Sequence, residues 1–221
     1  TSRIQAKGPT GGGTVLVGGD WQGTGDMRQA TKVTMEAGAT MDASATDKGD
    51  GGKVVLWSDV RNPLSMTSAH GTILAKGGVQ GGDGGQIETS GGRLQVEGVT
   101  GSAAASMGKA GEWLFDPTNI TIGSSGSANS GNDGSSISAT GINNLLNGGT
   151  SVTVTTFSGG GDLGNLTVSE AINKSSGNGD VTLTLRAALL VTTYAVTLSA
   201  ADVAGQTVDL AHLPEEYEPV E

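Results

Sequence analysis

The sequence predicts an all-β solenoid, a stack of coils made of strands, with one short helix near residues 140–147. Three observations predict it. One pattern is written twice at a spacing of 33 residues, short β-prone runs recur between glycine clusters, and helical periodicity is nearly absent. A repeat at fixed spacing is typical of repeat architectures. A unit this small cannot bury its apolar side chains alone, so it must stack on its neighbours.

The repeat occupies most of the stretch from residue 38 to residue 92. Its first copy spans 38–54 and its second spans 71–87. Each copy contains a Gly-Asp-Gly-Gly block, which starts at Gly49 or Gly82, and ends in an apolar residue that begins a strand. Glycines in such blocks are typical of turns whose backbone needs a positive φ angle. The repeat therefore predicts two consecutive coils with the same turn.

The segments before the second copy also have strand character. Residues 12–15 repeat the Gly-Gly-x-Val form of the first copy, which predicts an earlier coil of the same solenoid. Residues 31–35 alternate between polar and apolar, so Val33 and Met35 are expected to face inward. Pro63 lacks the N–H that a strand ladder needs, so we expect a bend there.

The densest group of large apolar residues lies at 111–122. We expect Trp113 and Phe115 in the core and a corner at Asp116-Pro117 between two strands. The side chains expected to form the core are those of Val33, Met35, Val54, Leu56, Leu74, Ile87, Trp113, Phe115, Ile120 and Ile122.

Residues 138–149 depart from the strand pattern. Apolar residues within 142–146 are spaced i, i+3, i+4, as on one face of a helix. Ser138 or Thr140 can cap the start of this helix, and Gly148 can close its end. The sequence therefore predicts one short helix that lies on the solenoid.

We expect three segments along the chain. Residues 1–123 form a β-helix with Gly-rich repeats, and 124–211 continue it with a Ser/Gly loop and the short helix. Residues 212–221 are acidic, contain two prolines and form a tail or docking arm. At about 20 residues per coil, the chain would form roughly ten or eleven coils.

Composition excludes several classes of function. The chain has 12 basic and 22 acidic residues and no basic run, which argues against nucleic-acid binding. It has no cysteine, so disulfides, thiolate metal sites and a catalytic thiol are excluded. Because no apolar run reaches about 18 residues, we expect no transmembrane segment. The first residues do not have the form of a signal peptide, so we expect either a processed or excised piece or a chain made without one.

Four stretches taken together resemble the large bacterial exoproteins of the filamentous-haemagglutinin type: 51–59, 71–78, 81–91 and 111–122. The resemblance covers roughly residues 8–185. Proteins of this family are exported by two-partner secretion. The resemblance implies a right-handed parallel β-helix, a secreted or cell-surface location and an outer-membrane secretion partner. Family members are surface adhesins, secreted fibres or toxin stalks.

We therefore expect an extracellular structural or adhesive protein whose subunits stack head to tail into a filament, fibre or sheath. The docking residues would lie in the tail, at Leu213, Pro214, Tyr217 and Val220. Alternatively, the tail folds back on its own last coil. A second reading is a rod segment of a long adhesin that binds glycans or host surfaces.

The sequence also suggests two minor kinds of site, for calcium and for glycosylation. Asp42, Asp47, Asp50 and Asp83 lie in Gly-rich turns and offer the oxygen ligands that calcium takes. Their surroundings lack the calcium β-roll pattern, so turn formation is favoured, and we expect no cofactor. The sequons at Asn119, Asn165 and Asn173 are possible glycosylation sites.

The alternative to a structural or adhesive protein is an enzyme, a β-helix that cleaves polysaccharides. Glu88, Arg93 and Glu97 fall close together in sequence and would line a groove in such an enzyme. However, aromatic residues are only 3% of the chain, and His70 and His212 are its two histidines. No Ser-His-Asp order appears. We therefore expect no enzymatic activity.

Overall fold

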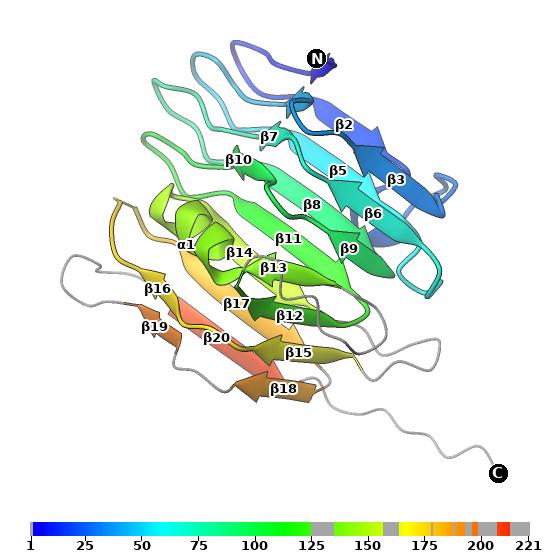
Figure 1. The fold of residues 1–221 in the computed structure, drawn as a ribbon. Helices are drawn as coiled ribbons and strands as arrows, with labels where there is room; N and C mark the ends of the chain where they lie inside the picture. The colour runs from blue at the N-terminus through cyan, green and yellow to red at the C-terminus, as the bar shows by residue number, and fades with distance from the viewer. Residues whose placement is uncertain are drawn as a thin grey trace.

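The computed structural model describes residues 2–124, 135–156, 164–177, 179–187, 189–192, 196–198 and 207–212. These residues form mostly strands, and every pairing between named strands is parallel. Most of the strands lie in three sheets that run alongside one another, and two further strands form a separate pair (Figure 1). The expectation of an all-β fold with one helix is thus confirmed for the described part of the chain.

The sheets are as follows. Sheet I contains β1 (Arg3–Gln5), β4 (Thr40–Asp42), β7 (Thr72–Leu74) and β10 (Thr100–Ser102). Sheet II contains β2 (Thr14–Val17), β5 (Lys53–Trp57), β8 (Gln86–Gly91), β11 (Glu112–Pro117), β14 (Ser151–Thr155), β17 (Thr182–Ala187) and β20 (Thr207–His212). Sheet III contains β3 (Lys32–Met35), β6 (Met66–Ala69), β9 (Arg93–Gln95), β13 (Ser136–Ser138), β12 (Ile120–Gly123), β15 (Asn165–Val168) and β18 (Leu189–Thr192). A further pair joins β16 (Ile172–Lys174) to β19 (Val196–Leu198).

The chain visits the three sheets in turn. Each of the first three passes, β1 to β3, β4 to β6 and β7 to β9, places one strand in each sheet. Residues that pair in sheet II are 39, 33 and 26 positions apart at Val15–Val54, Val54–Ile87 and Ile87–Trp113. The expected 20 residues per coil was therefore too short, and sheet II has seven strands among the described residues, against the ten or eleven coils expected of the whole chain. Loops of unequal length between the sheets account for the difference.

The interior is filled by side chains that stack along the sheets. One row in sheet II consists of buried residues at matching register positions, Val15, Val54, Ile87, Trp113, Val152 and Leu183. The rings of Trp113 and Phe115 stack with centroids 5.2 Å apart. The Trp113 indole N–H donates to Thr89 Oγ1 at 2.9 Å, which satisfies the one polar atom of this ring.

Nine of the ten side chains expected in the core are buried there, and Leu74 is the exception. Leu74 is only partly buried and faces outward, while the preceding residue, Ile73, is fully buried. A strand alternates its side chains between two faces, so an error of one residue moves a side chain to the other face. A three-residue strand such as β7 offers too little alternation to settle that choice from sequence.

The predicted helix is present as α1 (Ala139–Asn147). Ser138, rather than Thr140, is its N-cap, because the Ser138 hydroxyl accepts the N–H of Gly141 at 2.9 Å. Gly148 follows the last turn. The helix lies between β10 and β16 and contacts both, so it takes the position that a strand of sheet I would fill (Figure 1). It is therefore an integral layer, not an element added to the outside.

The end of one strand differs from the expectation. β11 continues through Asp116 and Pro117, and the chain bends at Thr118 and Asn119 instead. Pro117 is tolerated because β14 pairs with β11 only as far as Phe115, which leaves Pro117 at an edge on that side. Sheet II includes strands on both sides of residue 123, from β2 to β11 before it and from β14 to β20 after it. No helix in the described ranges is long and apolar enough to cross a membrane.

Candidate functional site

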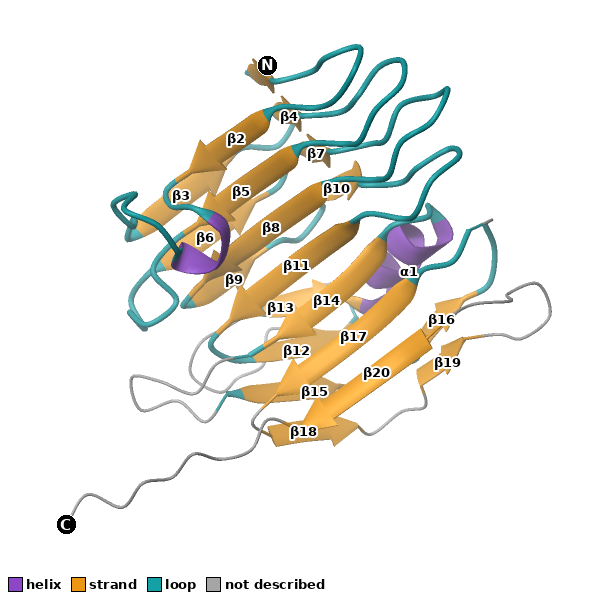
Figure 2. Ribbon diagram, turned by 180° about the vertical axis from the view of Figure 1, so that it is seen from behind, coloured by secondary structure: helices purple, strands orange, loops and turns teal. Residues whose placement is uncertain are grey.

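A loop at residues 18–30 folds over the outer face of sheet II and covers a polar site. It links β2 to β3 and contains the short helix η1 (Trp21–Gly23), which contacts β5 and β8 (Figure 2). The turn requires positive φ at Gly18 (84°) and Gln22 (52°). Asp20 caps η1 by accepting the N–H of Trp21 at 2.7 Å.

The loop buries apolar side chains that point away from the core. Val54 and Leu56 face inward on β5, so Val55 and Trp57 face outward, yet both are at most 2% exposed. A Cβ added to Gly19 or Gly23 would overlap the Trp57 indole, so the loop backbone lies directly on this ring. The indole N–H donates to Gln29 Oε1 at 3.1 Å. The loop is thus shaped to cover Trp57.

Beneath the same loop lie two carboxyl groups, Glu88 on β8 and Asp116 on β11. Glu88 is fully buried, with Oε2 accepting the N–H of Gln22 and Oε1 accepting the hydroxyl of Ser90, each at 2.8 Å. Asp116 pairs in register with Ser90, so it is a diagonal neighbour of Glu88. Its Oδ1 is buried and has no hydrogen-bond partner. Asp116 also lines a cavity of about 210 Å³ together with Gln22, Gln29, Trp57, Asp59 and Arg61.

The surroundings of the pair favour its protonated form. Burial raises the pKa of Glu88 to about 7, although the hydrogen bonds from Gln22 and Ser90 and the charge of Lys53 act in the opposite direction. Burial also raises the pKa of Asp116 to about 7, and the nearby Glu88 carboxyl adds to the effect. Both carboxyl groups are therefore expected to be neutral in mild acid and to ionise near neutral pH.

Glu88 does not lie beside Arg93 and Glu97, the residues considered for the alternative of a polysaccharide-cleaving enzyme. Glu88 belongs to sheet II, whereas Arg93 begins β9 of sheet III and Glu97 follows that strand, both exposed. The chain turns between the sheets after Gly91, so sequence proximity does not produce a shared face. The carboxyl group beside Glu88 is that of its diagonal neighbour Asp116, on the adjacent strand β11. Asp116 had been expected in a corner between strands.

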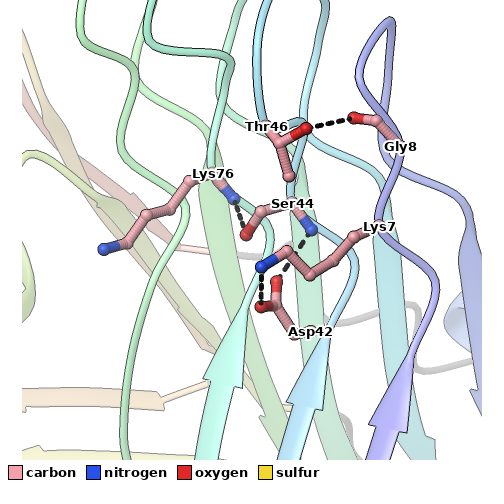
Figure 3. Close-up of polar contacts among 6 residues, drawn as sticks. All are labelled: Lys7, Gly8, Asp42, Ser44, Thr46 and Lys76. Carbon is pink, nitrogen blue, oxygen red and sulfur yellow. Dashed lines mark hydrogen bonds and ion pairs between the residues drawn. The ribbon is translucent and has the colours of Figure 1, made fainter.

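A second, open site is a groove of about 540 Å³ along the outer side of sheet I and the loops that follow its strands. The Lys7 ammonium pairs with Asp42 Oδ2 at 3.4 Å (Figure 3). The backbone N–H of Lys76 donates to Ser44 Oγ at 3.0 Å, while its side chain points away from Ser44. Leu74, which had been expected in the core, lines this groove. The groove combines hydroxyl groups, two ammonium groups and small side chains.

Three of the four aspartates considered for calcium accept backbone N–H groups through their carboxylates. Asp50 Oδ1 accepts the N–H of Asp83, and Asp83 Oδ1 accepts the N–H of Lys109, each at 2.8 Å. Asp42 Oδ1 accepts the N–H of Ser44 at 3.0 Å, and Asp47 offers its carbonyl to the N–H of Gln80. Within the described ranges, no three His, Asp or Glu side chains gather as metal ligands would. The repeated Asp thus links each Gly-rich turn to the next.

His70 has partners that sequence reasoning missed. One ring nitrogen, Nε2, lies 3.0 Å from Ser68 Oγ, and the other, Nδ1, lies 2.8 Å from the carbonyl oxygen of Glu97. Ser68 in turn donates to Gln95 Oε1 at 3.1 Å. These bonds tie β6 to β9 and to the turn after it. His212 is the last residue of β20.

The three sequons differ in their surroundings. Asn119 Oδ1 accepts the backbone N–H of Asn165 at 2.6 Å, so these two residues are used in joining adjacent passes. Asn173 is exposed, and its backbone N–H donates to Asn143. We expect any N-glycan to attach at Asn173. Mass spectrometry of protein from a glycosylating host would test this: Asn173→Gln should remove the added mass, and its persistence would show attachment elsewhere.

The tail residues Leu213, Pro214, Tyr217 and Val220 lie outside the described residues. No protein-family model matches this chain, and no curated protein matches it. The resemblance to filamentous-haemagglutinin-type exoproteins therefore remains a hypothesis, based on the four stretches that suggested it.

Proposed function

We propose that this chain is a right-handed parallel β-helix that serves as a structural or adhesive element of an extracellular rod, of the filamentous-haemagglutinin type. One observation carries the proposal: the strands of successive passes pair in parallel, so all three sheets grow along one axis. Such a stack has each layer supported by its neighbours. At about 4.8 Å per strand, the seven strands of sheet II extend on the order of 30 Å.

In this proposal the rod lengthens by adding layers. Among the described strands, β1, β2 and β3 each pair on one side only. Exposed strand edges accept further strands, and a head-to-tail contact between identical units propagates into a filament. The added layer would come from a second copy of the chain or from an adjoining part of a longer secreted protein. An outer-membrane partner would export it.

Electron microscopy and sedimentation of the purified chain, beside a variant ending at Ala211, would test assembly. The proposal expects long fibres from the full chain and shorter particles from the variant, because the tail residues 213–220 would dock on the neighbouring copy. Monodisperse single subunits from both chains would refute self-assembly and leave the segment of a longer adhesin.

The groove in sheet I favours a second function, binding of an acidic glycan. The described part of the chain gives the Lys76 ammonium no carboxylate partner, while Lys7 is paired with Asp42. Hydroxyl groups of Ser44, Thr46 and Ser102 line the same groove. The net charge of −10 opposes acidic ligands at long range, so attraction would depend on this local group.

Lys76→Ala is expected to weaken binding of a uronic-acid polysaccharide about fivefold at low salt, since one local charge contributes roughly 1 kcal/mol. The loss should shrink as salt screens the charge. Lys48→Ala is the matched control, because Lys48 is exposed but lies outside the groove. Titration calorimetry or surface plasmon resonance would measure both. Equal losses for the two variants would indicate unspecific attraction and contradict a groove site.

A further inference from the structure

The loop at residues 18–30 and the carboxyl pair beneath it form a unit with two possible states. Only a few polar contacts attach the loop to the sheet, notably the Gln22 N–H on Glu88 and the Trp57 indole N–H on Gln29. The Lys53 ammonium also lies 5.4 Å from the centroid of the Trp21 ring. The Asp59 N–H donates to the Ala30 carbonyl at 2.9 Å, and glycine backbone packs on the Trp57 ring. Lifting the loop would return both carboxyl groups to water and expose Val55 and Trp57.

The charged groups around the pair do not neutralise it. Lys53 on β5 attracts Glu88, while Asp20 in the loop and Asp116 on β11 repel it. Asp59 and Arg61 line the cavity beside Asp116, yet Asp116 Oδ1 has no hydrogen-bond partner. On the far side, β14 places Thr155 beside β11, and Arg186 lies one strand further, on β17. Lys53 thus acts on Glu88 and Arg61 lines the cavity beside Asp116, but neither gives Asp116 Oδ1 a hydrogen bond.

We propose that Glu88 and Asp116 form a proton-dependent latch that holds the 18–30 loop closed when the pair is protonated and releases it when both carboxyls ionise. In the closed state, a neutral Glu88 still accepts the Gln22 N–H and the Ser90 hydroxyl, and no buried charge opposes the loop. Ionisation of both groups places two like charges beneath the loop, where Glu88 is fully buried and Asp116 is partly buried. Opening restores their hydration. The direction follows: the loop is closed in mild acid and opens above neutral pH.

A buried cysteine can report this opening, because the natural chain contains none. Val55→Cys places a thiol under the loop, and Val154→Cys places one in the core, where Val154 is also fully buried. The rate of labelling with a methanethiosulfonate reagent is measured from pH 5 to pH 8. Each rate is divided by the rate in a Glu88→Gln/Asp116→Asn background at the same pH, which removes the intrinsic titration of the thiol.

The latch predicts that the normalised rate for Val55→Cys rises at least tenfold between pH 5 and pH 8. A single carboxyl whose pKa changes from about 7 to 4.5 on opening would favour opening by up to roughly 70-fold over this range. The normalised rate for Val154→Cys should not rise with pH, because opening of the loop does not require global unfolding of the core. A pH-independent ratio for Val55→Cys, or an equal rise at both positions, would overturn the latch.

The unsubstituted protein provides a second readout. Hydrogen exchange of the Gln22 amide, expressed as a protection factor, should fall at least tenfold from pH 5 to pH 8, because this amide donates to Glu88 only when the loop is closed. The Val54 amide, on β5 between β2 and β8 of sheet II, is the internal reference. Constant protection of Gln22 across this range would overturn the proposal even if a cysteine variant failed to fold.

Discussion

Gly84→Ala is expected to destabilise the protein by about 3 kcal/mol or more, or to prevent folding. A Cβ at Gly84 would overlap the carbonyl oxygen of Ala103 and the backbone nitrogen of Gly111, both in the next pass. These atoms belong to backbone that is hydrogen bonded, since the Gly111 N–H donates to Ala103 O at 2.8 Å. Neither can move aside without breaking the contact between two layers. Urea unfolding followed by circular dichroism would measure the loss.

Gly98→Ala is the control for this substitution. Gly98 has φ of 75°, but nothing lies within 4 Å of an added Cβ. The cost should therefore be only the strain of a left-handed residue, about 1–2 kcal/mol. Equal losses at both positions would show that backbone conformation, not close approach of layers, explains the glycines. Such a result would contradict the layer-contact explanation.

The same comparison refines the role expected for the Gly-Asp-Gly-Gly blocks. Gly82 does have a positive φ of 116°, as expected for a turn glycine. Gly84 is not among the glycines with positive φ, and it is required because another backbone approaches it. Two different physical reasons thus act within one four-residue block.

Glu88→Gln is expected to stabilise the protein at pH 8 and to leave it nearly unchanged at pH 4. The folded pKa of Glu88, about 7, is above its ordinary value of 4.5, so the folded state binds the proton more tightly. Its contribution to stability is therefore fully present below pH 4.5 and is lost as the pH rises through 7. The full difference corresponds to an upper limit of about 3 kcal/mol. Opening of the loop would relieve part of it and reduce the measured gain.

Thermal and urea unfolding at several pH values would measure this effect. The wild-type chain should lose stability between pH 4.5 and pH 7, and Glu88→Gln should flatten that part of the profile. Glu97→Gln makes the same chemical change at an exposed carboxyl and should not flatten it. If both variants, or neither, altered the profile, burial of Glu88 would not be the cause.

Local patterns predicted the elements whose signal is contained in a few neighbouring residues. The helix at 139–147 was predictable because its apolar spacing, its Ser138 cap and its terminal Gly148 all lie within one short stretch. The inward positions of Val33 and Met35 followed from strand alternation. The repeated sequence shows the 33-residue offset between Val54 and Ile87. In the structure these two residues pair directly.

The carboxyl pair and its covering loop were decided only by the tertiary structure. Gln22, Glu88 and Asp116 come from three different passes. No local sequence pattern predicts that the loop containing Gln22 covers the two carboxyl groups. The choice between Ile73 and Leu74 likewise depended on how β7 pairs with its neighbours. Periodicity specifies which residues share a face of one element. Only the register between layers, set by loops of unequal length, specifies which faces and charges meet.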